Sequence, residues 1–114
     1  MGEWVEVWKK SGEINVEEPF QVLVTVEDYI TFPETAKVGE TVDCGYINIK
    51  GKTSETVKVR AVVTIDGNVA VVDGYALDRE YEVSKYKAVT FPVVVKFGSS
   101  GKRKVEVVVY QWKE

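Results

Sequence analysis

The chain contains no histidine and a single cysteine, Cys44. One cysteine excludes a disulfide within the chain. A serine or cysteine nucleophile is activated by a neighbouring base, most often histidine, so acid–base chemistry here would rest on carboxylates alone. Cys44 shares its strand parity with Val42, and we interpret it as a small buried hydrophobic residue. We therefore predict that the protein is not an enzyme and has no catalytic residues.

The chain also has no excess of basic residues over acidic residues. The 15 Lys and Arg residues stand against 18 Asp and Glu residues, which gives a formal net charge of −3. Proteins that bind nucleic acid present a basic face to the phosphates, so we expect no nucleic-acid partner. No apolar run approaches the roughly 20 residues that cross a membrane, and residues 1–4 lack the pattern of a secretory signal. We expect no membrane insertion, and these features leave the compartment unknown.

Helical periodicity is absent as well, whereas alternation of apolar and polar residues is common. Valine occupies 24 positions, and β-branched and aromatic side chains favour strands. The pattern predicts an all-β fold, an immunoglobulin-like two-sheet β-sandwich of about seven to nine strands, formed as a single domain over residues 1–114. Residues 1–19 supply an additional N-terminal strand and turn. The predicted core is Val24, Val59, Ala61, Val63, Phe91, Val93, Val95 and Val107.

Turn residues divide this pattern into strands. The main strands are predicted over residues 4–9, 20–27, 41–50, 56–65, 69–72, 88–97 and 102–113. Asp66-Gly67 is the strongest hairpin signal, because both central residues of a type I′ turn need positive φ. Apolar parity changes across Gly45, which indicates a β-bulge. Pro92 lies within a predicted strand and therefore indicates an edge strand or a bulge.

The order of these parts resembles a known family. The segments Phe32-Pro33-Glu34-Thr35-Ala36-Lys37-Val38-Gly39-Glu40-Thr41-Val42, Ile65-Asp66-Gly67 and Ala88-Val89-Thr90-Phe91 are similar to immunoglobulin-like modules of the CARDB type, which are common in archaeal and bacterial cell-surface proteins. The resemblance covers roughly residues 20–110. It implies a seven-stranded sandwich at the cell surface with an adhesive or spacer role, and it supplies no catalytic residues. The chain departs from the family over residues 4–18 and 73–87, where a specific function would most plausibly reside.

Three groups of residues are weighed as chemical sites. Gly51-Lys52-Thr53 lacks the upstream glycine of a phosphate-binding loop, since Tyr46 stands there, and it is interpreted as a strand turn. Acidic residues are expected to face solvent at Glu17, Glu18, Glu27 and Asp28. A second group lies near turns, at Asp66, Asn68, Asp73 and Asp78, where a calcium site is the minor alternative. We predict no metal and no cofactor. Abundant Lys and Glu with few Asn and Gln are typical of a thermophile protein.

Aromatic residues gather in the two terminal strands. The candidate interaction surface consists of Trp4, Trp8, Tyr110 and Trp112. Trp4 and Trp8 share one parity of the first strand, while Tyr110 and Trp112 lie on the outward parity of the last. These side chains could be core, a contact with a protein partner or another copy, or a carbohydrate surface. We predict a non-enzymatic immunoglobulin-like interaction or structural module of a cell-surface or virion assembly, with a carbohydrate-binding module as the alternative.

Overall fold

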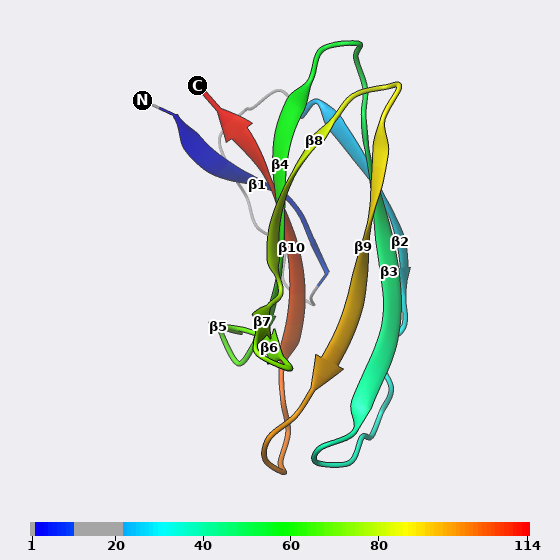
Figure 1. Ribbon diagram of the computed structural model, residues 1–114, viewed down its shortest axis with the longest axis vertical. Helices are drawn as coiled ribbons and strands as arrows, with labels where there is room; N and C mark the ends of the chain where they lie inside the picture. Colours follow the sequence, from blue (N-terminus) through cyan, green and yellow to red (C-terminus); the bar gives the residue numbers. More distant parts are fainter. Residues whose placement is uncertain (1, 11–21) are drawn as a thin grey trace.

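The computed structural model describes residues 2–10 and 22–114, and their regular structure is entirely β (Figure 1). Every strand pair in it is antiparallel. The strands are β1 (Glu3–Lys10), β2 (Val24–Ile30), β3 (Thr41–Gly51), β4 (Val57–Ile65), β5 (Asn68–Val69), β6 (Val71–Val72), β7 (Tyr75–Ala76), β8 (Asp78–Val83), β9 (Ala88–Lys96) and β10 (Val105–Lys113). The all-β prediction is confirmed.

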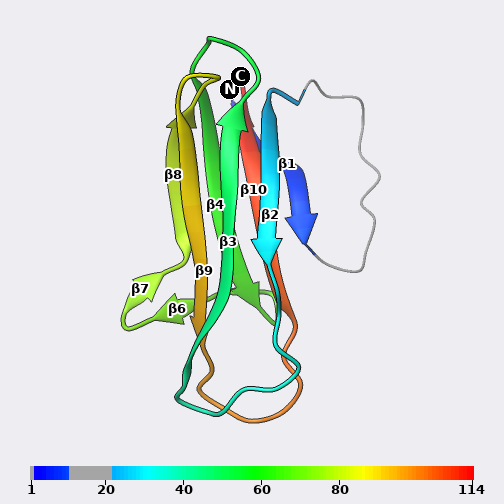
Figure 2. The same cartoon turned by 90° about the vertical axis from the view of Figure 1, so that its right-hand side faces the viewer.

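Two sheets face each other (Figures 1 and 2). Sheet A has the order β1-β10-β4, and both β5 and β8 pair with β4. Sheet B has the order β2-β3-β9, and β6 and β7 form a separate hairpin. The chain changes sheets between β3 and β4 and again between β9 and β10, so the core is assembled from segments distant in sequence. The arrangement is that of a β-sandwich.

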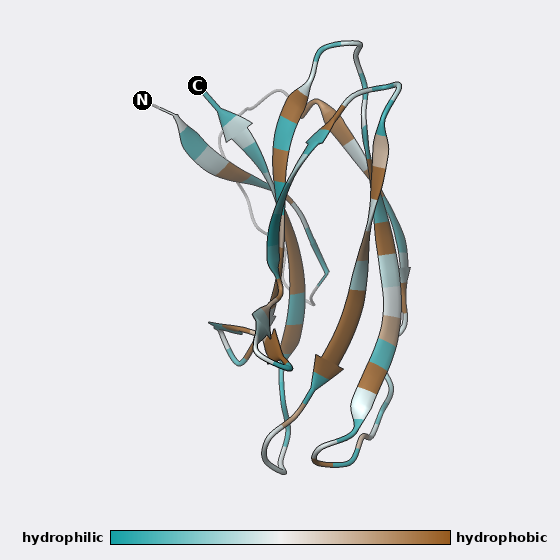
Figure 3. Cartoon of the chain, viewed as in Figure 1, coloured by the Kyte–Doolittle hydropathy of each residue, from teal (hydrophilic) through white to brown (hydrophobic). Residues whose placement is uncertain are grey.

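The core lies between the inward faces of the two sheets. Hydrophobic and polar residues alternate along β3 and β4, as Figure 3 shows, because neighbouring residues of a strand point to opposite faces. Each of the eight predicted core residues is buried, so the predicted inward parity is confirmed. The cluster also includes Ile30, Cys44, Ile47, Ile49, Val57, Ala70, Val83 and Val109.

A bulge in β3 carries the parity change that the sequence indicated. The register with β9 shifts between Asp43 and Tyr46, and Gly45 has a φ of 106°. A Cβ atom at Gly45 would lie 2.1 Å from the carbonyl oxygen of Tyr29, so only glycine fits there. Pro92 pairs with Tyr46 beside this bulge, and its strand β9 is an edge of sheet B. Both predictions are therefore confirmed.

Two turns have the backbone of type I′ hairpins. Asp66 and Gly67 have φ values of 51° and 85°, and Asp73 and Gly74 have 51° and 84°. The first turn joins β4 to β5 as predicted, and the second closes the β6–β7 hairpin. The stretch after it forms β7 and β8, of which β8 pairs with β4 from Val57 to Val62.

The second strand begins later than predicted. The alternation of apolar residues predicted that this strand begins at Phe20, which lies outside the described residues, whereas β2 runs over Val24–Ile30. The reason is that the backbone of Leu23 bonds elsewhere. Its N–H donates to Oε1 of the buried Gln111 at 2.8 Å, and its carbonyl accepts from the N–H of Lys52. The predicted last strand likewise starts three residues later, at Val105.

Replacing Phe91 with Ala is expected to lower the free energy of unfolding by about 3–5 kcal/mol, because the ring is 1% exposed and its loss leaves a cavity. Urea unfolding at equilibrium measures the change. Lys50→Ala, at an exposed position of the neighbouring strand, is the control and should change stability by about 0.5 kcal/mol or less. Equal effects of the two substitutions would contradict the assigned register.

Candidate functional site

The terminal strands bring three of the four candidate aromatic residues together. β1 pairs with β10, and Trp4 lies opposite Trp112. Their ring centroids are 5.0 Å apart and their planes meet at 72°, an edge-to-face pair. The ammonium of Lys58 lies 5.7 Å from the Trp112 ring, and the guanidinium of Arg60 lies 5.9 Å from the Tyr110 ring. These aromatic rings are partly buried against one another and beneath cations, so they do not form a flat exposed row.

Trp8 does not join this cluster, and the prediction that it shares a face with Trp4 is wrong. The register between β1 and β10 shifts between Glu6 and Trp8, so that Trp8 lies opposite the buried Val109. This bulge inserts one residue, Val7, and an inserted residue reverses the parity of those that follow. Trp8 consequently packs against the core from the edge of sheet A. No glycine marks this bulge in the sequence.

An ion pair sits next to the aromatic cluster. The Nε of Arg60 donates to Oδ1 of Asp78 at 2.6 Å, and a second nitrogen donates to Oδ2. This two-fold hydrogen bond, opposed by partial burial, holds the pKa of Asp78 below its ordinary value. The same contact raises the pKa of Arg60. The pair joins β8 to β4 and holds the guanidinium near Tyr110.

Among the described residues, three large exposed apolar side chains lie together elsewhere, on a segment that we term the arm, residues 68–76. Val69, Val71 and Tyr75 are 41%, 57% and 73% exposed. Figure 2 shows the β6–β7 hairpin of the arm projecting from the side of the sandwich beside β9. The base of the arm is anchored, because Ala70 is buried and its N–H donates to the carbonyl of Val63 at 2.9 Å. The tip is held by one ion pair, Asp73 to Lys96 at 3.6 Å.

A signal for the arm is present in the sequence. The stretch Val69-Ala70-Val71-Val72, the turn Asp73-Gly74 and then Tyr75-Ala76-Leu77 is apolar at both parities. A short apolar run of this kind, bounded by turns, is typical of strands that are buried on both faces. The structure instead leaves the hairpin exposed, so the sequence pattern and the burial disagree at this segment.

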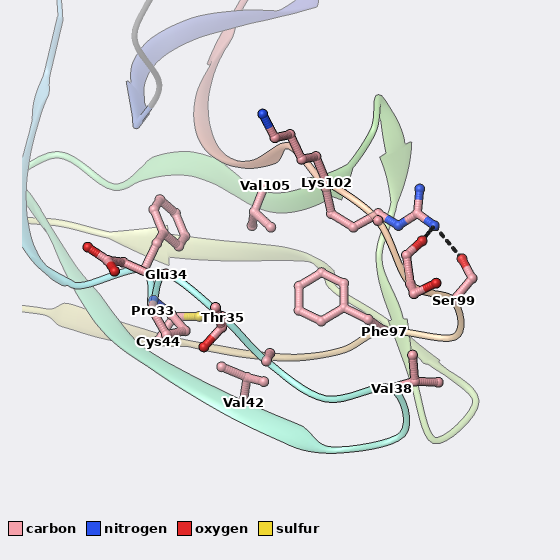
Figure 4. Close-up of a pocket in the computed structure, with 15 residues that line it drawn as sticks. Pro33, Glu34, Thr35, Val38, Val42, Cys44, Phe97, Ser99, Lys102 and Val105 are labelled. Carbon is pink, nitrogen blue, oxygen red and sulfur yellow. Dashed lines mark hydrogen bonds between the residues drawn. The ribbon is translucent and has the colours of Figure 1, made fainter.

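A cavity of about 540 Å³ opens at the end of the sandwich, between residues 31–40 and 97–104. Its apolar lining includes Phe32, Val42, Cys44, Phe97 and Val105. In Figure 4 the Phe97 ring borders this space, with Val105 on one side of it and Cys44 and Val42 on the other. Except for Cys44, these lining residues are only partly buried although they pack against the core. Burial raises the pKa of the Cys44 thiol, and the neighbouring Asp43 raises it to a smaller extent. The thiol is therefore protonated at neutral pH.

The rim of the cavity carries cations on one side. Lys102 and Arg103 come from the loop before β10. Arg103 is engaged, since its guanidinium donates to the Ser99 hydroxyl at 2.5 Å and to Asp66 at 3.3 Å. Lys104 pairs with Glu106 at 2.8 Å. The structure shows no ion pair for Lys102 within the described part of the chain.

A second aromatic pair, which is exposed, lies on the outer face of sheet B. Tyr29 and Tyr46 are opposed on β2 and β3, with ring centroids 5.0 Å apart and an interplanar angle of 28°. They are 51% and 40% exposed. The Tyr29 hydroxyl donates to Glu27 at 2.8 Å, and this contact raises its pKa. Pro92 lies opposite Tyr46 on the other side, so the row crosses the whole sheet.

Several of the acidic residues weighed in the sequence form separate ion pairs. Asp28 pairs with Lys10 at 2.9 Å, and the turn residues Asp66, Asp73 and Asp78 each pair with a different cation. Glu17 and Glu18 lie outside the described residues. Across residues 2–10 and 22–114, no three His, Cys, Asp or Glu side chains are grouped as metal ligands would be. Nor does that part of the chain include a helix long and apolar enough to cross a membrane.

Comparisons with known proteins do not identify any of these surfaces. No family model, curated protein or solved structure matches this chain. The resemblance to CARDB-type modules therefore stays a prediction, and function has to be inferred from the surfaces themselves.

Stability at acid pH should depend on Asp78. Its pKa is lower in the folded chain than in the unfolded one, so its contribution is complete above the unfolded pKa and is lost as pH falls, below about pH 4. Asp78→Asn should therefore flatten the decline in stability between neutral and acid pH, as followed by urea unfolding. The control Glu55→Gln removes an exposed loop carboxyl and should leave the profile unchanged. Identical profiles for wild type and Asp78→Asn would contradict this assignment.

Proposed function

We propose that this chain is a non-enzymatic structural module of immunoglobulin-like type that associates with further copies of itself. The strand order supports the fold assignment. β2, β3 and β9 take the places of strands A, B and E, while β8, β4 and β10 take those of C′, C and F. β1 then fills the place of the final strand G, antiparallel to β10. In an immunoglobulin domain the C-terminal strand forms this edge of the sheet, whereas in this chain the N-terminal strand β1 forms it.

The proposal of self-association rests on the exposed side chains of the arm. Three large apolar side chains are exposed on one short projecting segment, and their number on that segment distinguishes it from scattered surface hydrophobics. The hairpin covers little of the core, because only its base at Ala70 is buried. Exposing such a segment carries a risk of non-specific aggregation, so a contact that covers it is the most economical explanation.

The edges of the sheets are less suited to association. β1, the edge of sheet A, carries charged residues along its length, at Glu3, Glu6, Lys9 and Lys10. β9 contains Pro92, which has no N–H to donate, and β8 carries alternating charges from Asp78 to Glu82. Charges and proline on edge strands oppose pairing with a further strand. β2, the other edge of sheet B, carries Glu27 and Asp28, so association through the arm is favoured over extension of a sheet.

The biological setting follows from the resemblance alone. Within this proposal the module is a repeating or connecting unit of a cell-surface assembly, as CARDB-type modules are, and it performs no reaction. Its chemistry is confined to contacts: apolar burial at the arm and the ion pairs around it.

Replacing Val71 and Tyr75 with Ser should weaken self-association while leaving the melting temperature nearly unchanged, because both side chains are exposed but would become buried in the contact. Analytical ultracentrifugation over a concentration series measures the association. Tyr86→Ser is the matched control, since Tyr86 is 78% exposed and lies outside the arm, in the connection between β8 and β9. A wild-type chain that sediments as a monomer throughout the series would refute the proposal.

A carbohydrate-binding function is the second candidate, and the Tyr29–Tyr46 pair favours it. The two rings are nearly parallel and exposed, and the hydroxyl of Thr90 and the amide of Asn48 lie on strands beside them. Aromatic faces next to hydrogen-bonding groups are suited to sugar rings. The perpendicular, partly buried Trp4–Trp112 pair is less suited.

Affinity electrophoresis in gels that contain soluble polysaccharides tests this second function. Retardation of the wild-type chain is expected, with loss of retardation in Tyr29→Ala and Tyr46→Ala and no change in Tyr86→Ala. The substituted tyrosines lie on the face opposite the core, so the variants should remain folded by circular dichroism. Equal mobility of the wild type with and without polysaccharide would exclude the sugars tested and favour self-association alone.

A further inference from the structure

We propose that the arm of one copy inserts into the end cavity of a second copy. This inference rests on the proposed self-association and names the surface that receives the arm. Its contact is heterologous, because the arm and the cavity are different surfaces of the same chain. None of the residues that line the cavity belongs to the arm, so the cavity of each copy is available to another.

The arm has the composition of an inserted element. Val71 and Ala76 lie opposite each other on one face of the hairpin, and Val72 and Tyr75 on the other. Val71 and Tyr75 are thus exposed on opposite faces. A hairpin lying flat on a partner surface would cover only one of them, whereas a hairpin seated in a cavity covers both. The apolar residues at both parities of this segment fit the second geometry.

The cavity has the size and lining to receive apolar side chains. Its volume of about 540 Å³ falls within the range of binding pockets, about 300–1,000 Å³, which are mainly apolar with a few polar groups at the mouth. Phe32, Phe97, Val42 and Val105 line the cavity and remain partly exposed. An aromatic side chain such as Tyr75 would bury these groups.

Charge also matches between the two surfaces. The turn of the arm carries Asp73, which pairs with Lys96 of its own copy at 3.6 Å and whose side chain is still 71% exposed. The rim carries Lys102, which has no ion pair in the described part of the chain, next to Arg103. Glu34 also lines the opening, but its carboxylate points away from Phe97 in Figure 4. An acidic tip entering beside a basic rim fixes the orientation of the insertion and adds to its rate.

A mixing experiment separates this contact from others. The arm variant Val71→Ser with Tyr75→Ser keeps an intact cavity. The cavity variant Thr35→Trp fills the opening with an indole and keeps an intact arm; Thr35 is exposed and lines the cavity. Each variant alone should sediment as a monomer of 12.8 kDa, with its apparent Kd raised about tenfold or more. An equimolar mixture should form a species of twice that mass, since one intact arm meets one intact cavity.

The outcomes discriminate between the two proposals. A Thr35→Trp variant that associates like the wild type would show that the arm contacts another arm or another surface outside the cavity. A mixture that stays monomeric would show that an intact arm and an intact cavity do not form the contact. Either result overturns insertion into the cavity while self-association through the arm stands. If Thr35→Trp does not fold, Lys102→Glu, an exposed substitution outside the core, serves instead and should weaken association more at low salt than at high salt. Unchanged association of Lys102→Glu would also count against the inference.

Discussion

The burial of two valine-rich sheet faces against each other is the interaction on which the structure depends. Residues from both sheets meet in one apolar cluster, in which Val59, Phe91 and Val107 are almost fully inaccessible to solvent. Strands that alternate in polarity have only one face to bury, and a second sheet supplies the cover. Polar side chains are thereby directed outward on both sides, and the surface chemistry of the protein follows from the same parity.

Parity is not constant along every strand, and its interruptions decide which side chains reach the surface. The bulge at Gly45 turns Cys44 toward the core and Tyr46 outward beside Tyr29. The bulge at Val7 leaves Trp4 on the outer face and brings Trp8 to the core. One inserted residue in a ladder thus moves an indole from surface to interior, which is why bulges accompany the aromatic surfaces of this sandwich.

The arm and the end cavity are complementary departures from a closed sandwich. On one side of the sandwich projects a hairpin whose apolar side chains are only partly covered by the rest of the fold. At one end a partly open apolar space remains. Both features leave apolar side chains exposed, and burying those side chains would stabilise the folded chain further. Features that lower stability in this way often serve function. The proposed insertion would bury the apolar side chains of both the arm and the cavity, and the free energy of this burial would contribute to the affinity between copies.

Alternation in the sequence determined the fold class, the main strands, the eight predicted core residues and the Asp66-Gly67 turn. Glycine and proline chemistry located the Gly45 bulge and the edge position of Pro92. These features are local, since they depend on the period of a strand or on the φ of one residue. Tertiary structure decided which strands became neighbours, the reversed face of Trp8, the exposure of Tyr75 and the cavity around Cys44. Such features depend on contacts between residues far apart in sequence, and no local pattern records whether an apolar side chain finds its cover.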